Sequence, residues 1–247
     1  MFILSALAGV VAGLVNALAG GGPILTLLAL SFAGVDPRTA SLTSTTALLP
    51  GQALTGLAGW RRLAPSLPFT TAPLIAAAVG GGAGALLLVT VPLRFFSAIV
   101  PFLVAFATLA YVANTYRRRS AERAEQPRRL QASGSAVTAV LGTYGGFFGG
   151  GNSFLLLAVF SFLGLDEKRG NAAKNVFVCA INGAAAVVFV GSGLVDWTVA
   201  LGLCVGNLAG SALALQVIDK IPASWLYRFV VAAGVALTAY LAAKAFL

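Results

Sequence analysis

The segment NALAGGGPILT at residues 16–26 and a related segment, GTYGGFFGGGNS at residues 142–153, decide the fold of this 247-residue chain. Each places three consecutive glycines inside a charge-free apolar run, residues 2–33 and 130–165. Because roughly 20 helical residues cross a bilayer core, each run is longer than one crossing needs. Glycine costs about 1 kcal/mol relative to alanine inside a helix. We therefore predict that each run is a helix that stops, turns and restarts inside the membrane, where the broken backbone lines a site.

The residues that follow each glycine triplet suit a restarting helix. Pro23 would stand in the first turn, where its missing N–H costs nothing, and Asn152 would be an N-cap. Both restarted helices would direct free N–H groups and a positive dipole end towards the middle of the bilayer, which favours an anion. The alternative is that the glycines only allow close helix packing. That alternative suits an isolated glycine, whereas triplets at two corresponding places favour broken helices.

Composition places the chain among integral membrane proteins. Hydrophobic residues make up 59% of it, charged residues 9%, and the mean hydropathy is +0.93. The apolar runs are continuous rather than alternating, so the spans are helices and not barrel strands. The net charge of +9 comes from Lys and Arg in short loops, which indicates membrane topology rather than nucleic-acid binding. The chain has no His and no acidic residue deep in a span, so we expect no enzyme activity, no cofactor and no metal.

The chain divides into two related halves. Residues 1–116 form the first transmembrane repeat, residues 117–131 a basic linker, and residues 132–247 the second repeat. Glycines 20–22 correspond to glycines 149–151, and SFAGVD at 31–36 corresponds to SFLGLD at 161–166. Each half holds four apolar segments: 2–33, 39–60, 63–93 and 95–116, then 130–165, 175–195, 197–218 and about 224–246. The fold class is an all-α polytopic membrane protein whose first segment in each repeat is broken or re-entrant.

The distribution of Lys and Arg predicts the topology. If all eight segments cross once, nine basic residues lie on one side and seven on the other, which is almost no bias. If the first and fifth segments instead return to their starting side, thirteen of the 16 lie together and three opposite. The positive-inside rule prefers the second arrangement. It predicts two inverted repeats in the inner (plasma) membrane, with the linker cytoplasmic and both termini outside. The sequence leaves open whether these segments re-enter or cross twice.

Polar side chains within the spans are few, and we take those near the two glycine breaks as candidate substrate ligands. Aligning the halves matches Ser44 with Lys174, Thr45 with Asn175 and Gln52 with Asn182. Hydroxyls and amides at matched positions suit an oxyanion with several acceptor oxygens. The candidate substrate-binding residues are Asn16, Gly20, Gly21, Gly22, Pro23, Ser44, Thr45, Gln52, Gly149, Gly150, Gly151, Asn152, Ser153, Lys174, Asn175 and Asn182.

Each candidate also has a purely structural interpretation. Lys174 is either a cation at the site or a lysine whose ammonium reaches the cytoplasmic interface. The Ser and Thr hydroxyls either bind substrate or bond back to their own helix. Asp36, Asp166, Asp196 and Asp219 stand at segment ends, where we expect solvated or capping roles.

The chain resembles, over essentially its whole length, the sulfite exporter TauE/SafE family, also called the toluene-sulfonate uptake permease family. The resemblance rests on Gly13, Asn16 and the GGGP of residues 20–23, on GVDP at 34–37 and GLDE at 164–167, and on GGFFGGGN at 145–152. It implies a membrane carrier for sulfur-containing anions such as sulfite, sulfonates or sulfoacetate. Many members are known only as probable membrane transporters, so the resemblance does not fix the anion.

We therefore expect a secondary transporter that passes a small oxyanion across the lipid bilayer by alternating access, with the anion held at half-helix N-termini near the midplane. The alternatives are an anion or small-solute channel, since paired half-helices also build pores, and a non-transporting membrane subunit. The direction of transport, a coupling ion and homo-oligomerisation are left open by the sequence.

Overall fold

The computed structural model describes residues 2–63, 71–120, 132–163, 165–217 and 223–246, and every secondary-structure element in these ranges is an α-helix. Within these ranges the predicted eight segments form ten helices, because the first and fifth are each divided in two, as the glycine triplets predict. The helices are α1 (Phe2–Leu18), α2 (Gly22–Phe32), α3 (Pro37–Leu63), α4 (Thr71–Thr90), α5 (Leu93–Ser120), α6 (Ala132–Phe148), α7 (Asn152–Phe162), α8 (Glu167–Ser192), α9 (Trp197–Val217) and α10 (Ala223–Phe246).

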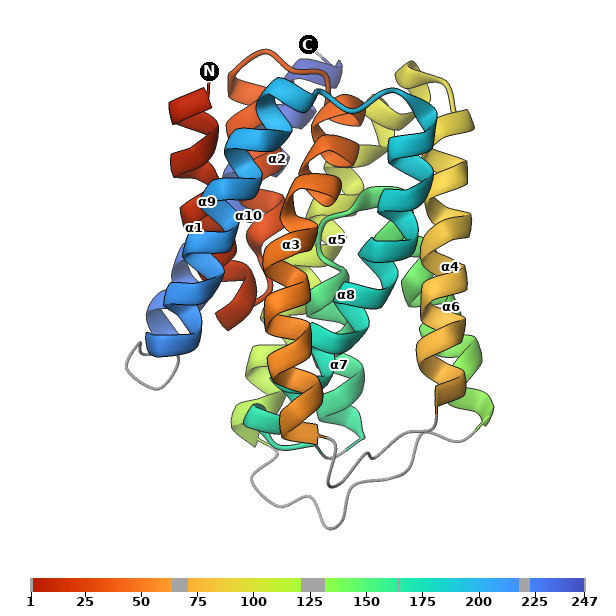
Figure 1. Ribbon diagram of the computed structural model, residues 1–247, viewed down its shortest axis with the longest axis vertical. Helices are drawn as coiled ribbons and strands as arrows, with labels where there is room; N and C mark the ends of the chain where they lie inside the picture. Colours follow the sequence, from red (N-terminus) through yellow and green to blue (C-terminus); the bar gives the residue numbers. More distant parts are fainter. Residues whose placement is uncertain (1, 64–70, 121–131, 164, 218–222, 247) are drawn as a thin grey trace.

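The two divided segments are hairpins that enter the bundle from opposite ends. In Figure 1, α1 runs from the upper end to about the middle, and α2 returns to the upper end. Helix α6 runs from the lower end to about the middle, and α7 returns to the lower end. The chain breaks between these helices therefore lie inside the bundle and not at its ends.

The other six described helices run along the bundle in alternating directions (Figure 1). Both chain termini lie at the upper end in Figure 1, whereas α5 ends and α6 begins at the lower end. Helix α5 continues through Arg117, Arg118 and Arg119 to Ser120, and residues 121–131 of the linker lie outside the described residues.

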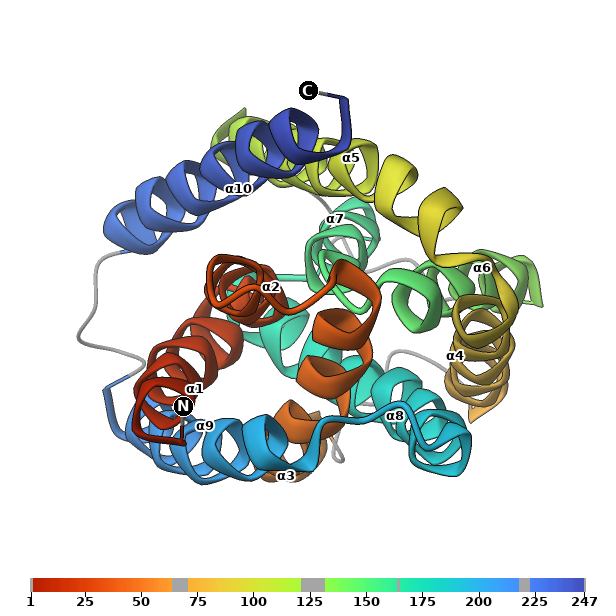
Figure 2. The same ribbon diagram turned by 90° about the horizontal axis from the view of Figure 1, so that it is seen from above.

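Helix contacts join the two halves throughout. Helix α1 packs on α9 as α6 packs on α4, and α3 packs on α8 (Figure 2). Helix α5 packs on α10, and the short helices α2 and α7 lie between this pair and the α3–α8 pair. The two breaks thus lie where elements of both halves surround them.

Glycines bring two of these helix pairs into close contact. A Cβ on Gly206 would fall on the carbonyl of Ala6, and one on Gly146 would fall on the carbonyl of Gly81. Glycines recur at every fourth position on these faces, which is the small-residue spacing of membrane helix interfaces. They are Gly9, Gly13, Gly202, Gly206 and Gly210 in the α1–α9 pair, and Gly80, Gly84, Gly142 and Gly146 in the α4–α6 pair. For these glycines the packing interpretation is correct.

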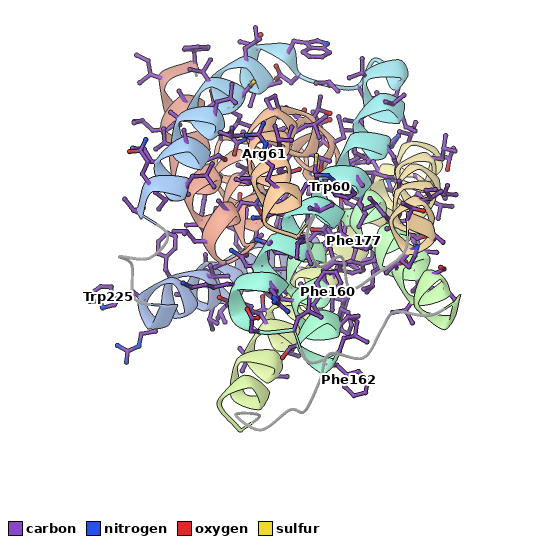
Figure 3. All side chains as sticks on the ribbon, turned by 60° about the horizontal axis from the view of Figure 1, so that its bottom comes forward. Trp60, Arg61, Phe160, Phe162, Phe177 and Trp225 are labelled. Carbon is purple, nitrogen blue, oxygen red and sulfur yellow. The ribbon has the colours of Figure 1, made fainter. Side chains whose placement is uncertain are left out.

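The outer surface is that of a membrane protein. Four described helices are long and apolar enough to span a bilayer: Thr71–Thr90, Leu93–Ala113, Lys168–Ser192 and Trp197–Val217. Figure 3 shows Phe162 and Trp225 pointing away from the bundle, where they are exposed. Phe160 and Phe177 instead lie together inside, with ring centroids 5.2 Å apart.

Acidic residues begin three of the full-length helices. Asp36 accepts from the backbone N–H of Thr39 (3.0 Å), Asp166 from that of Arg169 (2.9 Å), and Asp196 from that of Val199 (3.2 Å). These bonds satisfy N–H groups that have no partner within the helix. The expected capping role is confirmed for these three residues, whereas Asp219 lies outside the described residues.

Candidate functional site

Both breaks depend on glycines in the left-handed backbone region. Gly20 has φ of +93°, Gly149 +73° and Gly151 +80°, values that residues with a Cβ adopt only with strain. Pro23 lies in the first turn of α2, as predicted. The prediction that Asn152 is an N-cap is wrong: Gly151 holds that position and Asn152 is the first helical residue. The left-handed turn at Gly151 starts the helix one residue earlier and leaves the Asn152 amide free to bond elsewhere.

Lys174 lies at the first break and is fully buried on α8. Its ammonium donates to the backbone carbonyl of Asn16 (2.8 Å), and the amide of Asn171 donates to the carbonyl of Ala17 (3.2 Å). Two side chains of the second half therefore cap the last turn of α1, where helix carbonyls have no partner within the helix. The interpretation that the Lys174 ammonium reaches the membrane interface is wrong.

The first turn of α7 completes this cluster. A Cβ on Gly20 would collide with Ser153, and its position lies 3.6 Å from Cδ of Lys174. Gly20 thus lets the first break approach both residues of the second half. Asn16, Gly20, Ser153 and Lys174 are the Lys174 cluster, four predicted site residues that the fold brings together.

A chain of side-chain amides runs from α7 to α3. Asn152 donates from Nδ2 to Oδ1 of Asn182 (3.3 Å), and Asn182 donates from Nδ2 to Oε1 of Gln52 (2.9 Å). All three side chains are buried. Gln52 and Asn182 are the residues that the repeat alignment matches, so corresponding positions of the two halves meet directly.

The second break lies against hydroxyls of α3. Ser41 donates to the carbonyl of Phe148 (2.6 Å), the last residue of α6. The atom nearest to a Cβ position on Gly149 is the Thr45 hydroxyl oxygen, and Ser41 Oγ lies 3.2 Å from that position. Ser44 is also buried on α3. Ser41, Ser44 and Thr45 with the end of α6 are the hydroxyl cluster.

Unpartnered polar atoms concentrate at these clusters. Among the described residues, nine buried side-chain N or O atoms have no hydrogen-bond partner, and seven belong to residues named above. An unsatisfied buried polar group costs about 1–3 kcal/mol, so seven together indicate bound water or a ligand. The seven are Asn16 Oδ1, Ser44 Oγ, Thr45 Oγ1, Gln52 Nε2, Asn152 Oδ1, Ser153 Oγ and Asn171 Oδ1.

Some predicted residues lie apart from these groups. A Cβ on Gly21 would meet Val230 and Phe154, so Gly21 packs against apolar side chains. Gly150 likewise faces Phe148 and Ile24. Asn175 is buried on α8, and its carbonyl approaches Gly56 of α3.

Sequence reasoning omitted one buried amide from the candidates. Asn207 on α9 is fully buried and donates to the carbonyl of Leu48 on α3 (2.7 Å). It lies against Gly13 of α1 and Gly51 of α3. An amide inside an apolar run was the signal that could have found it, although the repeat alignment matches Asn207 with Ala77 and not with a polar residue.

The fold and these polar clusters define the class: an all-helical, polytopic membrane protein with a buried polar region between its halves. The model of the family described as Sulfite exporter TauE/SafE matches residues 5–241, so the chain belongs to that family of membrane transporters. A "Probable membrane transporter protein" of Haemophilus influenzae is 29% identical over 211 residues, which cover 85% of this chain and 82% of that protein. The "Probable membrane transporter protein YfcA" of Escherichia coli strain K12 is 27% identical over 84% of this chain and 77% of its own length. No solved structure matches the chain.

Proposed function

We propose that the protein is a secondary transporter that carries small sulfur-containing oxyanions, of the sulfite, sulfonate or sulfoacetate type, by alternating access. The family and the names of the relatives support a membrane transporter. The choice of a sulfur oxyanion rests on the family description and on the chemistry of the Lys174 cluster. The main structural support is the concentration of unpartnered buried polar atoms at two chain breaks inside an apolar bundle.

The anion lies in this proposal between the N-terminal turn of α7 and Lys174. Backbone N–H groups of a helix N-terminus and its positive dipole end stabilise an anion. The Ser153 hydroxyl is a buried donor without a partner at this turn. In this proposal the protonated Lys174 amine supplies the positive charge: its stem lies against Gly20, and its Nζ is held 2.8 Å from Asn16 O. Donors of this kind suit the acceptor oxygens of a sulfite or sulfonate group.

We also propose that the halves are inverted repeats in an inner membrane, with the linker in the cytoplasm and both termini outside. The opposite entry of the two hairpins and the common end of both termini support this arrangement (Figure 1). Helix bounds place Arg61, Lys168 and Arg169 at the end near the linker, and Arg38, Arg94 and Lys244 at the other. Lys174, which the charge count placed with the linker, is instead buried at the first break. Alternating access would then open the same anion site to each end in turn.

Flux measurements on reconstituted full-length protein test this function. A carrier gives saturable uptake of radiolabelled sulfite and counterflow driven by unlabelled sulfite or a sulfonate. Flux that rises linearly with concentration and shows no counterflow would make the protein a channel. If sulfite and sulfonates neither move nor compete, the substrate assignment is wrong.

A further inference from the structure

We propose that the hydroxyl cluster at the second break binds a monovalent alkali cation, with Na⁺ as the ion to test. If the protein is the proposed transporter, this ion would be its coupling ion. Only that coupling role rests on the proposed function; the cation site does not. The cation site itself follows from a difference in charge between the two breaks.

At the first break, a protein cation compensates the end of a helix. The C-terminal end of α1 carries a partial negative charge and carbonyls without helical partners. The Gly20 N–H donates to Val15 O (3.0 Å), and the Lys174 ammonium donates to the carbonyl of Asn16. A positive charge from α8 is therefore built into this end of α1.

At the second break, the corresponding position holds no charge. The repeat alignment places Ser44 of α3 where α8 has Lys174, and Ser41 where α8 has Asn171. The end of α6 has the same negative dipole as the end of α1 but lies against the neutral hydroxyls of Ser41 and Thr45. A small cation at this point would supply the charge that Lys174 supplies in the other half.

The oxygens around Gly149 suit an alkali ion. Ser41 donates a hydrogen bond to Phe148 O, which leaves the lone pairs of its own hydroxyl oxygen available as ligands. Thr45 Oγ1 and Ser44 Oγ are buried without a hydrogen-bond partner, and Thr45 Oγ1 is directed at Gly149. Neither α3 nor α6 contains Asp or Glu, and carboxylates are the usual ligands of Ca²⁺, so the neutral set favours a monovalent ion. Unwound backbone carbonyls and half-helix C-terminal ends coordinate Na⁺ in other transporter folds.

Thermal unfolding of the purified full-length protein tests the site without any transport. Tm is compared in about 100 mM chloride salts of Na⁺, K⁺, Li⁺ and choline, where a site filled by an alkali ion raises Tm by about 3 °C over choline. Thr45→Val keeps the side-chain shape but removes the ligand oxygen, and it should abolish the rise. Thr46→Val is the matched control, because its hydroxyl bonds back to Leu42 O (2.9 Å), and it should keep the rise.

A gain-of-charge variant gives an independent readout. Ser44→Lys introduces the ammonium found in the other half, so it should remove the effect of Na⁺ on Tm and raise Tm in choline. Equal Tm values in all four salts for the unmodified protein, or an unchanged Na⁺ effect in Thr45→Val, would overturn the cation site. In proteoliposomes, sulfite flux that is equal in Na⁺, K⁺ and choline would overturn the coupling while leaving the transport function intact. If Na⁺ raises Tm but no anion flux is measured, the cation site is supported and the proposed transport function is contradicted.

Discussion

Replacing Lys174 by Met separates a role in anion binding from a role in folding. Methionine keeps the unbranched stem of lysine and removes only the charged donor. In the folded protein the change loses one charge-assisted hydrogen bond, to Asn16 O, worth about 1.5–3 kcal/mol. It also removes the cost of burying an ammonium, which is several kcal/mol. Because these contributions oppose each other, we expect Tm to change by less than about 5 °C.

The effect of Lys174→Met on anion affinity should be larger than its effect on stability, and it should be a decrease. A bound oxyanion would lose its charged partner in a dry site, where such an interaction contributes about 2–3 kcal/mol. That loss corresponds to a decrease of roughly 30- to 150-fold in affinity. Lys244→Met is the control, because Lys244 is an exposed lysine in the last turn of α10.

The assay is competition of unlabelled sulfite against radiolabelled sulfite uptake, measured beside thermal unfolding of the same preparations. We expect K174M to unfold normally and to bind weakly, and K244M to match the unmodified protein in both measurements. Unchanged sulfite affinity in a folded K174M would refute the reasoning and leave Lys174 as a cap of α1 only.

Three further predictions follow from named contacts, each read by thermal unfolding. Gly20→Ala should destabilise more than Gly34→Ala, because both glycines have positive φ but only Gly20 faces another side chain; equal losses would contradict the contact with Ser153. Asn182→Leu should cost about 2–4 kcal/mol, since it leaves two buried amide groups unpaired, and a loss below about 1 kcal/mol would mean that the amide chain is not formed. Gly206→Ala should separate α1 from α9 and lower Tm, whereas Gly82→Ala, with open space around it, should not; a similar Tm for both would contradict the close helix packing.

The sequence predicted the hairpins because their cause is local. Three adjacent glycines disfavour a continuous helix wherever they occur, and the charge count independently placed the restarting segments on their starting side. Helix starts at Asp36, Asp166 and Asp196 were likewise predictable from residue type and position.

The site was predicted in composition but not in arrangement. Matching Gln52 with Asn182 came from the repeat, yet their mutual hydrogen bond depends on how α3 and α8 pack across the halves. The capping of α1 by Lys174 depends on the same packing, so sequence spacing left its role undecided. Asn152 was placed one residue outside its helix because the left-handed turn at Gly151 is not visible in residue type alone.

A density map of the reconstituted protein with saturating sulfite tests the central claim most directly. The account predicts density for one anion between the N-terminal turn of α7, Ser153, Gly20 and the Lys174 ammonium. Density for the anion at another place, or a well-ordered Lys174 and Ser153 with no anion beside them, would contradict the account.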